Sequence, residues 1–252
     1  MATTLQVTPR LWQLKLGVVN SFLLTTEDGL LIIDTGYPGS ADQLFAAVRE
    51  TGHDPAEIRH LLLTHCHIDH AGSAAELRRR TGARTYAHAI DAALITQGIT
   101  ERAGTKVAPG LVAALVYRFF IKNKSGHSEA MPIDEPLQHG DMLPLAGGIE
   151  VVHCPGHSAG QIALLLRQED VLVAADLCSH VFSLNYSTVN EDIDLAQQSI
   201  LQVADYGFEQ AVFGHGDPLV KHASQQLIAK FSKGQAAQPV LGGQSRPEYI
   251  AS

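Results

Sequence analysis

Residues 61–72, LLLTHCHIDHAG, place three histidines and an aspartate within six positions, directly after a run of leucines. Imidazole nitrogens and carboxylate oxygens are ligands that zinc, iron and manganese take in proteins. The run Leu61–Thr64 predicts a short buried strand, so the polar cluster follows the carboxyl end of a strand. Loops at such ends are held by a rigid scaffold and stay open to solvent. The H-x-H-x-D-H spacing therefore indicates a metal site rather than ordinary polar loop residues.

Three further segments repeat the pattern of an apolar run that leads to a ligand-type residue. VVHCPGHSAG contains His153 and His157, VLVAADL contains Asp176, and AVFGHGDP contains His215. If these strand ends meet at one edge, the donors are sufficient for two metal ions about 3.5–4 Å apart with a carboxylate between them. The candidate ligands are His65, His67, Asp69, His70, His157, Asp176 and His215.

Strands and helices are expected to alternate in both halves of the chain. The stretch 11–36 predicts a meander of three short strands, and helices are expected over 40–51, 71–82 and 89–97. A strand over 84–87 separates the last two of these helices. From residue 136 a second half resembles the first, with strands over 141–148, 149–157, 161–170, 171–177 and 210–216 and helices over 195–206 and 224–233.

Residues 98–130 break this alternation and are expected to form an insertion over the scaffold. Its apolar stretch, LVAALVYRFFI over 111–121, is too short to span a bilayer and contains Arg118. A core helix, a lid over a substrate pocket and a dimer surface are the three readings, and we predict a lid. We expect one domain over 1–233 that includes this lid, and a loosely ordered C-terminal tail over 234–252.

Composition excludes several partners for this chain of 252 residues. The hydrophobic content of 45% and charged content of 17% are ordinary for a globular protein. The net charge of −8 does not favour binding to nucleic acid or to an anionic membrane, which are also negatively charged, so neither partner is expected. The N-terminal residues do not form a secretory signal, which predicts a cytoplasmic protein. Three cysteines, Cys66, Cys154 and Cys178, are expected to be free thiols, with the first two buried.

The four segments resemble the metallo-β-lactamase superfamily, and the resemblance covers about residues 8–232. It implies a four-layer αβ/βα sandwich with a dinuclear metal site at one edge of the sheets. It also implies that His65, His67 and His157 bind the first ion, that Asp69, His70 and His215 bind the second, and that Asp176 bridges them. Asp34 of the DTG turn would contact the ligands and hold them in place without binding an ion itself. The family pattern selects His157 rather than His153, which is assigned to packing.

The resemblance implies a hydrolase with two divalent ions, most simply Zn²⁺, with Mn²⁺, Fe²⁺ or Co²⁺ as alternatives. Two such ions lower the pKa of a shared water, so that a metal-bridging hydroxide exists near neutral pH, and they polarise the oxygen of the bond to be broken. Asp69 would orient this nucleophile and pass its proton to the leaving group. The expected partner is a small-molecule substrate, and a homodimer is left open.

The residue at the bridging position separates branches of the superfamily. Zinc β-lactamases commonly carry cysteine or serine there, whereas Asp176 is similar to glyoxalase II-like thioesterases, acyl-homoserine-lactone lactonases and related ester or phosphodiester hydrolases. Lactonases commonly place a tyrosine three residues after this aspartate, where this chain has Ser179 followed by His180. Tyr186 is the candidate substitute, so Tyr186 and His180 join Asp69 as candidate catalytic residues.

The apolar insertion favours a lactone or carboxylic ester with an apolar substituent. The 37 residues after His215 leave no room for the C-terminal helical domain that is usual in glyoxalase II. The alternatives are a thioesterase, a phosphodiester or phosphotriester hydrolase, a β-lactamase, or a mononuclear iron sulfur dioxygenase of the same fold. A binding protein with a degenerate site is disfavoured, because no ligand position is missing.

Overall fold

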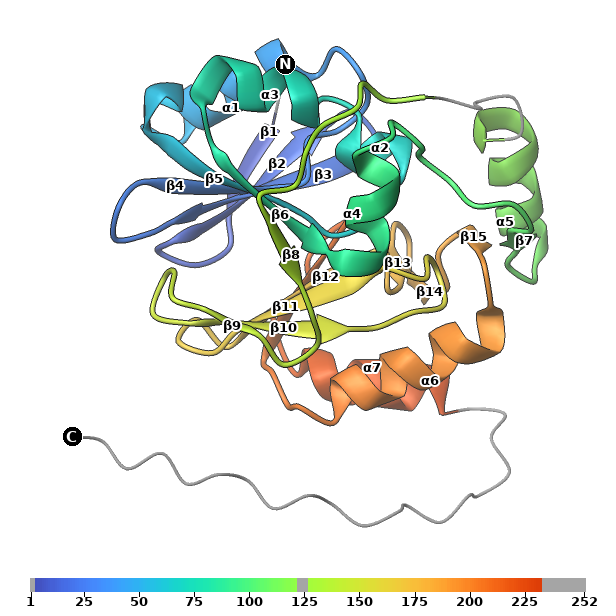
Figure 1. Ribbon diagram of the computed structural model, residues 1–252. Helices are drawn as coiled ribbons and strands as arrows, with labels where there is room; N and C mark the ends of the chain where they lie inside the picture. The colour runs from blue at the N-terminus through green and yellow to red at the C-terminus, as the bar shows by residue number, and fades with distance from the viewer. Residues whose placement is uncertain (1–2, 122–126, 233–252) are drawn as a thin grey trace.

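Two β-sheets pack face to face, and helices cover the outer face of each (Figure 1). The computed structural model describes residues 3–121 and 127–232, and the tail predicted over 234–252 lies outside this range. The first sheet has the order β1-β2-β3-β4-β5-β6-β8. Its strands are β1 (Thr3–Gln6), β2 (Leu11–Leu16), β3 (Val19–Thr25), β4 (Leu30–Ile33), β5 (Ile58–Leu63), β6 (Arg84–His88) and β8 (Glu135–Leu137).

The second sheet has the order β16-β12-β11-β10-β9. Its strands are β9 (Met142–Leu143), β10 (Ile149–His153), β11 (Ile162–Leu166), β12 (Val171–Ala175) and β16 (Gln210–Phe213). The first sheet is covered by α1 (Ala41–Glu50), α3 (Ala74–Thr81) and α4 (Ala89–Ile95), and the second by α6 (Ile193–Ala204) and α7 (Ala223–Phe231). Shorter elements are α2 (Ile68–Ala71), α5 (Leu111–Val116), β7 (Lys106–Val107), β13 (Ser179–His180), β14 (Leu184–Asn185) and β15 (Val189–Asn190).

Side chains of single strands alternate between two hydrophobic layers. On β5, Leu61 and Leu63 pack under the outer helices, while Leu62 packs between the sheets. On β11, Leu164 packs between the sheets and Leu165 packs toward α6 and α7. Because both faces of these strands are covered, their sequences are nearly continuous runs of apolar residues. The expected four-layer αβ/βα sandwich is confirmed.

The topology brings the carboxyl ends of several strands to one edge. β4, β5 and β6 are parallel to one another, and β12 is parallel to β16. The meander β2-β3-β4 is antiparallel, as predicted. Asp34 directly follows β4, His65 follows β5, Asp176 follows β12 and His215 follows β16. The candidate ligands are therefore held near strand ends of both sheets.

The helix predicted over 71–82 is α3, which begins at Ala74, and a separate short helix, α2, precedes it, which corrects the predicted start. α2 begins at Ile68, so Asp69 and His70 lie on a short helix rather than in the loop expected after the strand. The helical conformation is interrupted at Ser73, between α2 and α3. The hydroxyl of Ser73 donates to the carbonyl oxygen of Tyr37 over 2.6 Å, and its N–H donates to Thr35 Oγ1 over 3.2 Å. These bonds tie the break to the turn that contains Asp34.

The insertion is attached to the second half of the molecule through β7, which pairs with β15. In α5 and the π-helical turn that follows it, Leu111, Leu115 and Phe119 are 75%, 45% and 70% exposed. These exposures exclude a core position for the three side chains, and the lid stays a prediction; its residues 122–126 lie outside the described range. In the described part of the chain, no helix is long and apolar enough to cross a membrane.

Candidate metal centre

All seven predicted ligands meet at this edge of the sandwich. The ligand atoms form three groups, and within each group all atoms lie within 4.8 Å of one another. The groups are His65/His67/His157, Asp69/His70/His215 and His65/His70/Asp176. The first two groups are the two ligand sets that the sequence resemblance implies. His65 and His67 come from the loop after β5, Asp69 and His70 from α2, and the other three from the loops after β10, β12 and β16.

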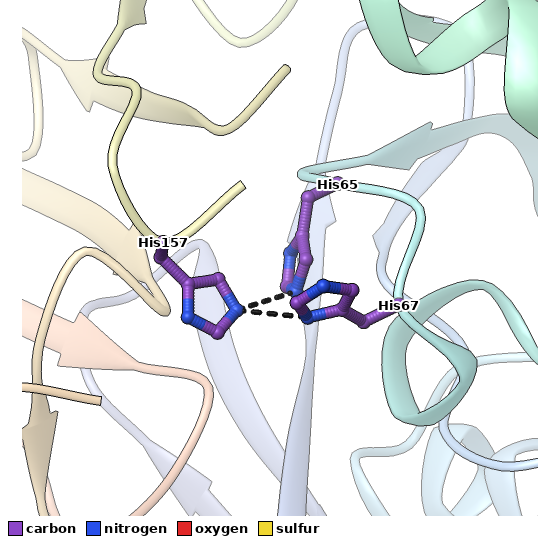
Figure 2. Close-up of side chains that lie close together, drawn as sticks. All are labelled: His65, His67 and His157. Atoms are coloured by element: carbon purple, nitrogen blue, oxygen red, sulfur yellow. Dashed lines mark hydrogen bonds between the residues drawn. The ribbon is translucent and has the colours of Figure 1, made fainter. Parts of the chain in front are cut away.

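His65, His67 and His157 point their rings toward one another from two different sheets (Figure 2). His157 Nε2 lies 2.9 Å from His67 Nδ1 and 3.2 Å from His65 Nε2. Two nitrogens on one tetrahedral zinc ion lie about 3.3–3.4 Å apart, because each Zn–N bond is about 2.0–2.1 Å. The spacing of the three nitrogens therefore suits a common ion.

Hydrogen bonds on the far side of the rings fix which nitrogens carry protons. His157 Nδ1 lies 2.7 Å from the carbonyl oxygen of Val189, which can only accept, so Nδ1 carries the proton. Thr64 donates its hydroxyl proton to Asp34, so its oxygen accepts from His65 Nδ1 over 3.1 Å. In their neutral forms, His157 and His65 therefore face each other with two lone pairs. A cation between them removes this repulsion.

The second group is oriented in the same way. His70 Nδ1 donates to Asp34 Oδ2 over 2.9 Å, and His215 Nδ1 donates to the carbonyl oxygen of Val18 over 2.8 Å. The Nε2 atoms of both rings then face carboxylates. His215 Nε2 lies 3.3 Å from Asp69 Oδ2, and His70 Nε2 lies 3.4 Å from Asp176 Oδ1.

Asp176 lies between the two groups. Its Oδ2 atom is 3.6 Å from His157 Nε2 and 3.5 Å from His215 Nε2, so one oxygen is near a member of each ligand set. Within the described residues, His70 Nε2 and Asp176 Oδ1 are buried without a hydrogen-bond partner. Buried polar atoms are rarely left in this state, and both are of ligand type. Two divalent ions therefore fit the residues present.

Burial keeps the first group of histidines neutral. It lowers the pKa of His65 well below 6.5, that of His67 to about 3, and that of His157 in the same direction. Neighbouring histidines lower the pKa values of all three further. Neutral imidazole is the form that binds a metal ion.

The carboxylates dominate the second group. Burial alone would lower the pKa of His70, but Asp176, Asp69 and Asp34 outweigh it and raise the pKa to about 9. For His215, Asp176 and Asp69 outweigh burial and raise the pKa to about 10. Burial would raise the pKa of Asp69, but His70 and His215 lower it below its usual 3.8, so this carboxylate is ionised. The group is built for positive charge, which protons or a metal ion can supply.

Gly214 makes room for this arrangement. A Cβ atom at this position would lie 2.2 Å from Asp176 Oδ1 and 2.7 Å from His70 Cε1. Any side chain here would displace a predicted ligand, which explains why glycine precedes His215.

His153 is outside the centre, as expected. Its ring stacks on His88 with ring centroids 4.1 Å apart, and its Nε2 donates to the carbonyl oxygen of Ala159 over 2.8 Å. The cysteines Cys66, Cys154 and Cys178 are free and buried, which confirms the expected free thiols and the expected burial of Cys66 and Cys154. Burial raises the pKa of each thiol.

The two other candidate catalytic residues occupy different surroundings. His180 lies beside His215, because its backbone N–H donates to the carbonyl oxygen of His215 over 3.0 Å. Its Nδ1 donates to the carbonyl oxygen of Asp217 over 2.9 Å, which leaves Nε2 as an acceptor in the neutral ring. The ring of Tyr186 instead packs against Phe231 of α7, with centroids 5.0 Å apart. The catalytic roles stay predictions, and this packing disfavours that of Tyr186.

Tyr37 is a residue near the centre that was not predicted. It is half-buried, and burial together with the charges of Asp69 and Asp176 raises its pKa to about 12. Its hydroxyl therefore keeps its proton near neutral pH. The signal in the sequence was its place directly after the DTG turn that contains Asp34.

Comparisons with known proteins show the family of this chain. A family model described as the metallo-beta-lactamase superfamily matches residues 14–215. The chain belongs to the metallo-β-lactamase superfamily. Within this superfamily, it is 27% identical over 158 residues to the hydroxyacylglutathione hydrolase GloC of Haemophilus influenzae, covering 62% of this chain and 65% of that protein.

Two further superfamily members extend the comparison. An N-acyl homoserine lactonase from a Bacillus species is 21% identical over 225 residues, covering 77% of this chain and 79% of the lactonase. The crystal structure of a metallo-beta-lactamase family protein from Thermus thermophilus superposes with a TM-score of 0.66 at 24% identity, covering 90% of this chain and 80% of that one. This structural likeness shows the superfamily fold.

Proposed function

We propose that this superfamily member is a dinuclear metallo-hydrolase that opens a lactone or carboxylic ester with an apolar substituent. The observation that carries the hydrolase is the convergence of six ligand atoms in two sets of three, with a seventh ligand, Asp176 Oδ2, near one member of each set. In the proposed site, His65, His67 and His157 would hold one ion, Asp69, His70 and His215 would hold the other, and Asp176 would serve both. When bound, the ions would acidify a water molecule and polarise the substrate's carbonyl oxygen.

Asp69 is the proposed proton carrier. Its side chain is 19% exposed and that of His215 is 22% exposed, whereas His70, His157 and Asp176 are at 6% or below. The centre is therefore most open where Asp69 and His215 meet, and a substrate reaches it from this side. An ionised Asp69 can accept the proton of the attacking water and deliver it to the leaving group.

Apolar residues near this opening support an apolar substituent. Val18, whose carbonyl oxygen holds His215, is 68% exposed, and Phe182, two residues after His180, is 92% exposed. The insertion with its exposed apolar residues is joined to β15, whose Val189 holds His157. An acyl chain bound over these side chains would be removed from water at little cost in polar contacts.

A thioesterase is the second candidate, because GloC is a hydroxyacylglutathione hydrolase by name. Lactones and thioesters both present a carbonyl carbon to the same attacking water, so the site alone does not separate them. The Bacillus lactonase favours the lactone. The two candidates differ in the leaving group to which Asp69 delivers the proton. It is an alkoxide for a lactone and a thiolate for a thioester.

The test is a panel of substrates assayed with zinc- and manganese-loaded protein: a medium-chain lactone, an aryl ester, a glutathione thioester, an aryl phosphodiester and a β-lactam. The proposal expects the largest kcat/KM for the lactone or ester, and Asp69→Asn should reduce it by about 10²–10⁴-fold. A thioester turned over faster than every oxygen ester would replace the proposal with its alternative. One tightly bound iron with oxygen consumption would identify a dioxygenase instead.

A further inference from the structure

A buried ion pair lies behind the first group of histidines. Asp91, in the first turn of α4, is fully buried, and its Oδ1 accepts a hydrogen bond from Arg102 Nη2 over 2.7 Å. Arg102 belongs to the insertion and is 24% exposed in its side chain. The pair therefore links the insertion to the helix layer beside the metal centre.

The pair holds both loops that supply this group. Asp91 Oδ2 accepts from the backbone N–H of Cys66, between His65 and His67, over 2.8 Å. It also accepts from the hydroxyl of Ser158, the residue after His157, over 3.1 Å. Each contact is one residue away from a predicted ligand.

Arg102 strengthens the second of these links. Its Nη1 donates to Ser158 Oγ over 3.1 Å and lies 3.3 Å from Glu191 Oε1. Glu191 in turn accepts from the N–H of Ala159 over 2.9 Å, and its own N–H donates to the carbonyl oxygen of His157 over 3.2 Å. The loop that contains His157 is thus held on three successive residues.

Gly160 shows that the fold reserves space for this network. A Cβ atom at position 160 would lie 2.2 Å from Asp91 Oδ1, so only glycine lets the loop pass over the carboxylate. The second group of ligands has a different support, Asp34 with Val18. Asp34 also reaches the first group, but only through Thr64 and His65, whereas the contacts of Asp91 are with the loops of the first group alone.

We propose that Asp91 and Arg102 are positioning residues that hold His65, His67 and His157 in register for one of the two ions. The inference rests on the proposed dinuclear function. Loss of the pair frees the loops that contain Cys66 and Ser158 to shift, so the affinity for the first ion falls. The affinity for the second ion is kept, because Asp34 and Val18 still orient His70 and His215. Residues that orient metal ligands typically change affinity by about 10–100-fold when removed.

The test is a Co²⁺ titration of metal-free protein, followed by visible absorption and elemental analysis. Arg102→Gln should lose about 10–100-fold in affinity for one ion and keep the other within about threefold. The spectrum of its remaining ion should match that of His157→Ala rather than His215→Ala. Arg78→Gln is the matched control, because it breaks a 2.7 Å pair with Asp134 and leaves all contacts of the centre in place.

The outcomes separate this inference from the proposed function. If the wild type binds two ions and Arg102→Gln weakens neither, or both equally, the positioning role is overturned and the dinuclear site stands. If the wild type binds none, both proposals fail. If it binds one, the dinuclear function fails, and the positioning role then stands or falls on whether Arg102→Gln weakens that ion.

A second variant covers a failure of Arg102→Gln to fold, which the melting temperature of the metal-free protein would show. Ser158→Ala removes only the hydroxyl that Asp91 and Arg102 share, and the ion pair remains. The same single ion should weaken by a smaller factor, about two- to tenfold. Equal affinities in Ser158→Ala and the wild type would overturn the role.

Discussion

Asp34 Oδ2 accepts a hydrogen bond from His70 Nδ1 over 2.9 Å, and both side chains are fully buried. The same carboxylate accepts from the backbone N–H of Thr64 over 2.8 Å and from its hydroxyl over 2.7 Å. Through Thr64 the carboxylate also sets the proton position in His65. One aspartate at the end of β4 thus orients a ligand in each of the two groups.

Asp34→Asn should weaken metal binding by about 10–100-fold, because an amide brings two donors to a place where Thr64 and His70 already donate. Isothermal titration with Zn²⁺ measures the loss. Asp28→Asn is the control, since Asp28 contacts His60 over 3.1 Å in a similar pair at the other end of β5. Equal affinities in both variants would contradict the orienting role of Asp34.

Asp176→Ala should lose metal occupancy together with activity, because its carboxylate lies near both ligand groups. His153→Ala should keep both, since His153 contacts His88 and Ala159 and none of the seven ligands. Elemental analysis after dialysis and a rate measurement give the comparison. If His153→Ala empties the site while His157→Ala stays loaded, the ligand assignment in VVHCPGHS is wrong.

Removal of metal should lower the melting temperature. Binding at about 100 times the dissociation constant stabilises a native state by about 2.7 kcal/mol. For a domain of this size, each kcal/mol corresponds to about 2–4 °C. Chelation should therefore lower the melting temperature by about 5–11 °C per site saturated to this degree. The effect should shrink to the share of the second site in a variant that lacks His65, His67 and His157, and an undiminished fall in that variant would point to chelator effects elsewhere.

His88 should contribute, in addition to the buried histidines of the first ligand group, to a fall in the stability of the metal-free protein between pH 6.5 and pH 4. Burial first, and then the stacked His153, lower the pKa of His88 from 6.5 to about 4. In this window the unfolded chain binds a proton that the folded protein excludes, so stability is present above pH 6.5 and is lost as pH falls.

Melting temperatures measured from pH 7.5 to pH 4 test this linkage. His88→Asn removes the titrating ring and keeps an acceptor at the N-cap of α4, where His88 accepts from the N–H of Ile90. The melting temperature of the variant should fall less steeply than that of the wild type as the pH falls from 6.5 to 4. Identical slopes would show that His88 does not carry the pH dependence.

Exposed apolar residues of the insertion should set the preference for acyl chain length. Each buried CH₂ contributes about 0.8 kcal/mol, nearly a fourfold change in affinity, so kcat/KM should rise along a lactone series. The double variant Leu115→Ser/Phe119→Ser should flatten this rise with little change in melting temperature, since both side chains are exposed. If kcat/KM rises as steeply with chain length in the double variant, the insertion does not contact the acyl chain of the substrate.

The sequence alone determined the identity of the predicted ligands and their place near strand ends. Ligand spacing such as H-x-H-x-D-H and runs such as LLL and LLII are local features, and burial of a strand on both faces is visible in its composition. The supporting role of Asp34 in the DTG turn was implied by the resemblance to the superfamily. Hence strand ends with ligand-type residues could be predicted from these local features, whereas the sandwich and the choice of His157 over His153 were implied by the resemblance to the superfamily.

Only the tertiary structure decided how these residues are oriented. The partners that fix the protons of His70, His157 and His215 lie 36, 32 and 197 positions away in the chain. Arg102 reaches Asp91 from an insertion whose pattern predicted only an apolar cover, and Tyr186 packs on Phe231 from α7. Hydrogen bonds and ring contacts between distant segments depend on how the sheets and helices pack, and no short-range pattern in the sequence records them.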